Sequence, residues 1–158
     1  MLDSKIIDEL RAFISLHETP LEASFTSYKT LESNLELDIE DFIKTKKKPV
    51  FKEVLFRFID ERKTSDSEIY KKAQMDRKHF SKIRTNVSYR PGKNTIIALA
   101  LALELTIEDT ETLLGSAGYS LSDSEYSDLV VQFCIERKIY NLNEVNYALD
   151  QLNLKPIG

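Results

Sequence analysis

The chain has 158 residues, a length that suits one domain with small additions, and its Gly and Pro content of four each argues against a turn-rich all-β fold. Apolar residues make up 42% and charged residues 30%, and no apolar run approaches the roughly 20 residues that a transmembrane helix needs. The net charge of −4 excludes a uniformly basic nucleic-acid-binding protein.

The N-terminal part predicts one helix followed by a segment of mixed signals. Residues 4–16 carry apolar side chains at helical spacing, and Pro20 marks a break. Residues 21–37 fit an extended segment as well as a helix, and a short helix is expected after Asp38. The run KTKKKP then predicts a boundary. We therefore predict that residues 1–48 form an N-terminal extension, a helix plus an irregular segment.

The main body is predicted over residues 49–120. An apolar stripe predicts a helix after Pro49. Ser65 and Glu68 form a capping box for a second helix, and Asp76 can cap a third over residues 77–86. After a polar loop, TIIALALALEL predicts a buried core helix, and TIEDTETLL predicts the next one.

Residues 121–158 predict a C-terminal helical pair. Ser122 and Glu125 form a second capping box, and Asn143 can cap the last helix. The first helix of the pair places apolar residues at helical spacing: Tyr126, Leu129, Val130, Phe133 and Cys134. Two interpretations remain: these helices cover the body, which we expect, or they pair two protomers into a homodimer.

Basic residues concentrate in one segment. Residues 71–93 hold eight basic side chains and one acid, a net charge of +7, while the rest of the chain carries −11. A local field of this sign attracts polyanions. The plainer interpretation is a solvated helix face.

The same segment has the order of a helix-turn-helix: two short helices, a tight turn and an exposed basic second helix. Such a helix fits the major groove, about 12 Å wide. With Phe80 and Ile83 inward, the residues on the second helix that face outward are Arg77, Lys78, Ser81 and Lys82. Phosphate contacts are expected at or beyond its end from Arg84, Thr85, Asn86, Arg90 and Lys93.

Residues 50–119 resemble the lambda-repressor-like, or Cro-type, helix-turn-helix domain. The resemblance rests on KTSDSEIYKKAQMDRKHFSKIRTN, with its apolar framework, and on NTIIALALALELTIEDTETLL after it. It implies that Arg77, Lys78 and Lys82 occupy base-reading positions and that Thr85 and Arg90 lie near the backbone-contacting loop.

Four positions differ from the pattern of that family. Asp66 replaces a residue, often Gln, that contacts a phosphate, and Asp76 adds another acid at the start of the third helix. Gln74 replaces the usual Gly of the turn, and Tyr70 replaces a small residue. These differences concern the DNA contacts more than the fold.

The sequence does not predict catalysis or a cofactor. Neither histidine has metal-ligand spacing with Cys134, and a cysteine on an apolar helix is typical of packing. The single cysteine and the acidic, amphipathic N-terminus, which is unlike a secretory signal, predict a cytoplasmic protein without membrane contact.

We therefore predict an all-α fold: a lambda-repressor-like helix-turn-helix core with an N-terminal extension and a C-terminal helical pair. The predicted function is a DNA-binding protein, a transcriptional regulator that reads duplex DNA through residues 77–86. The alternative is a non-catalytic adaptor that uses the same basic face to bind an acidic protein partner.

Overall fold

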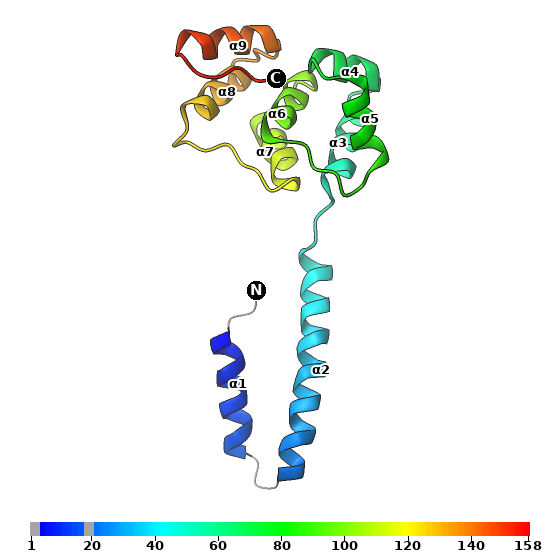
Figure 1. Cartoon of the computed structure of the whole chain (residues 1–158), viewed down its shortest axis with the longest axis vertical. Coiled ribbons are helices and arrows are strands. Elements are labelled where there is room, and N and C mark those ends of the chain that lie inside the picture. Colours follow the sequence, from blue (N-terminus) through cyan, green and yellow to red (C-terminus); the bar gives the residue numbers. More distant parts are fainter. Residues whose placement is uncertain (1–3, 18–20) are drawn as a thin grey trace. The chain divides into compact units, whose positions relative to one another are not determined.

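A computed structural model describes the backbone of residues 4–17 and 21–158 and the side chains of residues 4–12 and 31–158. Within these ranges every regular element is an α-helix, as the sequence predicts (Figure 1). The chain divides into two compact units, residues 1–47 and residues 48–158. Each unit is built from its own helices.

The first unit consists of α1 (Ser4–His17) and α2 (Leu21–Lys46), which contact each other. The prediction of an irregular segment was wrong, because residues 21–37 lie within one continuous helix. Ser and Thr cost only about 0.5 kcal/mol each in a helix, and the surrounding Leu, Glu and Ala favour it. Leu31 and Leu35, one turn apart, are half-buried, whereas all residues from 36 to 49 are exposed.

The second unit holds α3 (Phe51–Glu61), α4 (Asp66–Lys72), α5 (Arg77–Thr85), α6 (Lys93–Ala102), α7 (Ile107–Ser116), α8 (Tyr126–Glu136) and α9 (Leu142–Gln151). Helix α6 contacts α4, α7 and α9, and α7 contacts α3 and α8. Figure 1 shows α6 and α7 between the α4–α5 pair and the α8–α9 pair. The two terminal pairs are therefore joined through α6 and α7.

Helix α6 is the centre of the core. All residues from Ile96 to Ala102 are buried, and Ile96 and Leu99 are completely inaccessible to solvent. A helix that is apolar around its whole circumference has to be covered on every side. Burial of each large aliphatic side chain contributes about 1.5–3 kcal/mol. This confirms the core helix that the sequence predicts.

Six helices of the second unit are followed, two positions after their last residue, by a residue with a left-handed backbone. Five of these residues are not glycine: Lys63, Gln74, Glu104, Lys138 and Asn153, with φ between 51° and 59°. The sixth is Gly118, with φ of 82°. The amide of the following residue donates back across the helix end, as from Met75 to the Tyr70 carbonyl at 2.8 Å. These bonds satisfy carbonyls that a helix end otherwise leaves unpaired.

Three of these ends lead directly into the next helix. Soon after the left-handed position, the side chain of Ser65, Asp76 or Thr106 caps the new helix. The first two caps confirm the sequence prediction. The predicted box at Ser122 was wrong, since α8 begins at Tyr126 after Glu125. The last helix is capped by Asn141 rather than Asn143.

Helix α8 turns only part of its predicted apolar residues toward the core. Its buried residues are Asp128, Val131, Cys134 and Ile135. Of the five apolar residues named from the sequence, Cys134 is buried and Val130 half-buried, whereas Tyr126 is 76% exposed, Leu129 40% and Phe133 51%. Both faces of α8 are apolar, so the hydrophobic pattern does not select one of them. An ion pair of the buried Asp128 favours the observed face.

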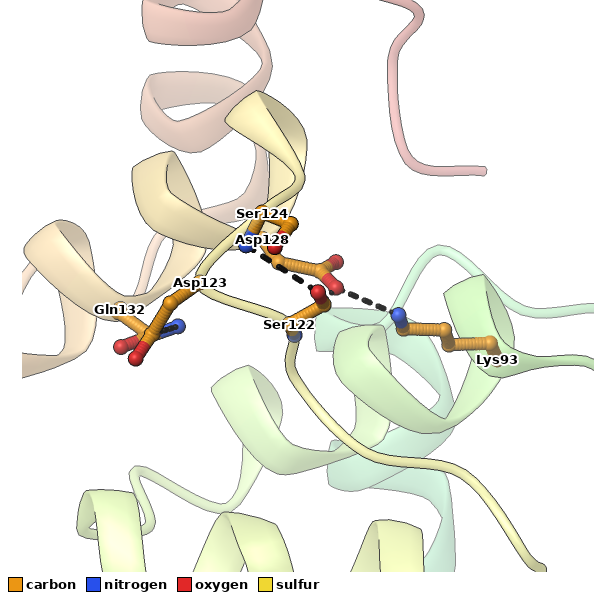
Figure 2. A network of polar contacts seen from close by, with 6 residues as sticks. All are labelled: Lys93, Ser122, Asp123, Ser124, Asp128 and Gln132. Carbon is orange, nitrogen blue, oxygen red and sulfur yellow. Dashed lines mark hydrogen bonds and ion pairs between the residues drawn. The ribbon is translucent and has the colours of Figure 1, made fainter.

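That ion pair joins Lys93 at the start of α6 to Asp128 on α8 (Figure 2). The Asp128 carboxylate accepts a hydrogen bond from Lys93 Nζ at 2.6 Å and another from the Ser122 backbone N–H at 2.8 Å. The Asp128 side chain is only 7% exposed. A buried carboxylate needs such partners, so this face of α8 has to turn inward.

We expect Asp128→Ala to lower the free energy of unfolding by about 1–3 kcal/mol, because it leaves a half-buried ammonium and an amide without their acceptor. Urea unfolding followed by circular dichroism measures this. The control is Asp123→Ala, since Asp123 is exposed and its side chain accepts a bond from Gln132, at 3.1 Å. Equal destabilisation of the two variants would contradict the role given to Asp128.

We expect Lys138→Gly to raise the free energy of unfolding by about 0.5–1 kcal/mol, because glycine adopts its φ of 58° without steric cost. Two residues earlier, Glu136 is the last residue of α8, where glycine should lower the free energy of unfolding by up to about 1 kcal/mol. Thermal unfolding of both variants checks the opposite signs. A Lys138→Gly variant that is less stable than the parent would rule out this account.

Candidate nucleic-acid interface

Helix α5 is held from behind by aromatic packing. Phe80 is buried and lies between Phe56 of α3 and Tyr70 of α4, with ring centroids 5.9 and 5.7 Å away. Ile83, one turn further on, is completely buried. The position expected to hold a small residue is thus filled by Tyr70, which packs on the Phe80 ring. These contacts fix which side of α5 faces solvent.

The solvent side of α5 is polar and basic. Five exposed residues follow one another along it at helical spacing: Arg77, Lys78, Ser81, Lys82 and Thr85. Nine helical residues span about 13 Å, which suits the width of a major groove. Within the described part of the chain, the side chains of Arg77 and Lys78 have no hydrogen-bond or ion-pair partner. Both cations are therefore available to a ligand.

Lys82 lies beside the loop that follows α5. Its ammonium is 5.4 Å from the centre of the Tyr89 ring, and the Tyr89 hydroxyl shares a 2.8 Å hydrogen bond with His79 Nε2. Tyr89 and His79 are both half-buried. The two contacts dock the loop against α5. They also place a cation and an aromatic ring together at the C-terminal end of the basic strip.

Arg84 is committed to an internal ion pair. Its guanidinium donates to the Asp66 carboxylate at the start of α4, at 2.5 and 2.8 Å, and lies 4.7 Å from the centre of the Phe56 ring. Asp66 therefore carries a neutralising partner. The second acid, Asp76, accepts the Lys78 amide at 3.2 Å as the cap of α5. Each acid that differs from the family's pattern has a structural role here.

Four other predicted residues also have internal contacts. Arg90 donates to the Ala117 carbonyl at 3.2 Å, and Lys93 is paired with Asp128. The Thr85 hydroxyl donates to the Ser81 carbonyl at 2.9 Å, and Asn86 accepts two bonds from Ser88. The structure thus brings four predicted residues together as a strip on α5, Arg77, Lys78, Ser81 and Lys82. We call these four residues the α5 strip.

A hollow of about 310 Å³ lies between α4 and α5 beside the α5 strip. Three of its residues, Asp66, Ser67 and Tyr70, belong to α4, and sequence reasoning did not assign Ser67 or Tyr70 to the site. Their only sequence signal is their position in the first turns of the helix that packs against α5. The hollow is lined by Asp66, Ser67, Tyr70, Arg77, Phe80, Ser81 and Arg84.

The turn between α4 and α5 is hydrogen-bonded to α9 of the C-terminal pair. Gln74 adopts the left-handed backbone that glycine usually supplies, with φ of 54°. Its side-chain amide donates to Asn143 Oδ1 of α9 at 2.8 Å. Glycine could not make this bond. Gln74 thus accepts a less favourable backbone conformation and gains a contact with α9.

Two kinds of group are typical of catalytic sites, a reactive thiol and a cluster of metal ligands. Burial raises the pKa of the Cys134 thiol, and the negative charge of Glu144 raises that pKa further, so the thiol stays protonated at neutral pH. Among the described side chains no three His, Cys, Asp or Glu residues cluster as metal ligands would. None of the described helices is long and apolar enough to cross a bilayer.

Comparison of the chain with protein-family models, with curated proteins and with solved structures gives no match. The candidate interface consists of a short basic helix with a buried apolar side and a solvent side about 13 Å long. Two of its cations have no partner among the described residues.

Proposed function

We propose that this protein is a non-catalytic DNA-binding regulator of the cytosol that reads duplex DNA with α5. The observation that carries the proposal is the α5 strip: exposed, basic, and mounted on a helix whose other side is fixed by Phe80 and Ile83. A helix held in this way can enter the major groove without reorganising the domain.

Arg77 and Lys78 lie in the first turn of α5, where a recognition helix approaches base edges most closely. An arginine guanidinium matches the two acceptors of guanine with two parallel hydrogen bonds, and lysine can reach the same acceptors. Lys82, one turn after Lys78, extends the strip. Ser81 can donate to or accept from either base or phosphate.

The internal contacts of the basic residues support the assignment of α5 as the DNA-reading helix. They separate cations that bind within the domain from cations that face solvent. Arg84, Arg90 and Lys93 have partners within the domain, so the cations of α5 that remain for DNA are Arg77, Lys78 and Lys82. Asp66 would repel a phosphate near the start of α4 if it were unpaired, and Arg84 screens that charge. Phosphate contacts should therefore come from α5 itself and from exposed groups beside it.

We expect Arg77→Ala/Lys78→Ala to weaken binding to a preferred duplex by about 1–3 kcal/mol for each base that these side chains read. If both residues instead contact phosphates, the slope of log K against log salt should fall by about 2. Selection from a random duplex pool, followed by fluorescence anisotropy at two salt concentrations, separates these cases. The matched control is Lys138→Ala/Lys155→Ala, which removes the same charge from exposed positions elsewhere.

Equal weakening in the control pair would mean that net charge alone governs binding, which contradicts a specific role for α5. Absence of duplex binding by the parent protein, even at low salt, would remove the proposal. The basic face would then be a surface for an acidic protein partner, and such docking should resist competition by nucleic acid.

We expect Asp66→Asn to strengthen DNA binding several-fold, because it removes a negative charge next to the α5 strip and frees Arg84 to approach a phosphate. Stability should change little, since the Arg84 side chain is 56% exposed and such surface pairs contribute about 0–1 kcal/mol. Anisotropy titration checks this against Asp60→Asn, an exposed acid at the end of α3. An equal gain in both variants would contradict the local effect.

A further inference from the structure

Apolar side chains follow one side of α2 from Leu31 to Phe42, and the C-terminal part of this stripe is exposed. Leu31, Leu35, Ile39 and Phe42 follow one another at intervals of four, four and three residues, which places them on one side of the helix. Leu31 and Leu35 are half-buried. Ile39 is 42% exposed, Phe42 63% and the adjacent Ile43 53%. Contiguous exposed apolar surface of this kind marks a contact site for another molecule.

The charges along the same helix are sharply separated. Residues 32–41 hold five acids and no base: Glu32, Glu36, Asp38, Glu40 and Asp41. Residues 44–48 hold four lysines and no acid. The change of sign falls at Phe42 and Ile43, the most exposed part of the apolar stripe. We call residues 32–41 the acidic arm and residues 44–48 the basic arm, and the exposed apolar residues Phe42 and Ile43 lie between them.

The charge pattern of α2 is complementary to that of a second α2 helix in antiparallel orientation. A second copy of α2 laid antiparallel places its basic arm beside the acidic arm of the first, and the reverse. A parallel copy would set like charges side by side, which is destabilising. A partner of a single charge sign could satisfy only one arm. The charge pattern therefore selects both the occupant and its direction.

We propose that α2 binds α2 of a second copy in antiparallel orientation, with the two-fold axis near Phe42. Residues 36–46 of the two chains then lie opposite each other over about 16 Å of helix. Ile39 and Phe42 of each copy pack in the centre, and Glu36 and Asp38 face Lys46 and Lys47 across the pair. The interface is isologous, so the assembly closes as a dimer.

This inference goes beyond the proposed DNA binding and does not rest on it. Self-association through α2 is measured without nucleic acid, and it can hold or fail whatever α5 binds. Where both proposals hold, each dimer carries two copies of α5, the arrangement that two-fold symmetric DNA sites require.

The test is a charge exchange between arms, read by sedimentation velocity of the full chain. The acid-reversed variant is Glu36→Lys/Asp38→Lys, which replaces acids of the acidic arm by bases. The base-reversed variant is Lys46→Glu/Lys47→Glu, which replaces bases of the basic arm by acids. We expect the parent to be dimeric, each variant to self-associate at least about tenfold more weakly, and an equimolar mixture to form a heterodimer. Circular dichroism confirms that each variant remains helical.

Two single substitutions locate the contact. Phe42→Ser should shift the parent from dimer to monomer, whereas Phe133→Ser, on the exposed stripe of α8, should leave the dimer intact. A monomeric parent, a heterodimer that fails to form in the mixture, or a dimer that responds to Phe133→Ser and not to Phe42→Ser would each overturn the proposal.

Discussion

The burial of α6 is the constraint on which the second unit depends. Its residues from Ile96 to Ala102 leave no polar side that could face water, so the helix is stable only when neighbours surround it. Helix α6 is contacted by α4 of the α4–α5 pair, by α7 and by α9 of the α8–α9 pair. The α8–α9 pair is therefore part of the same core as the basic motif, which explains why residues 48–158 form one compact unit.

Two polar links add direction to this apolar packing. The Lys93–Asp128 pair fixes the rotation of α8, a helix whose two faces are both apolar. The Gln74–Asn143 hydrogen bond connects the turn between α4 and α5 to the start of α9. Hydrophobic burial has no preferred direction, whereas a buried carboxylate must meet its donors. The Asp128 contacts therefore favour the observed rotation of α8.

The cations of the basic segment fall into two groups that are distinct in space. Arg84, Arg90 and Lys93 reach Asp66, the Ala117 carbonyl and Asp128, and so act within the fold. Arg77 and Lys78 on α5, and Lys71 and Lys72 on α4, are exposed and have no ion-pair partner among the described residues. The net charge of the segment thus overstates the number of cations that are free of internal contacts.

The helical fold, the order of the core helices and the buried side of α5 could all be predicted from the amino-acid sequence. Phe80, Ile83 and the α6 run lie at spacings that a helix with a buried side satisfies. The caps at Ser65 and Asp76 were likewise predictable, since capping involves residues only two or three positions apart. The remaining features depend on how the helices pack. The partners of Arg84, Arg90 and Lys93 lie 18, 27 and 35 residues away, and the inward face of α8 follows from one of them. Local pattern carries no information on contacts of that separation, because they exist only after the helices have packed.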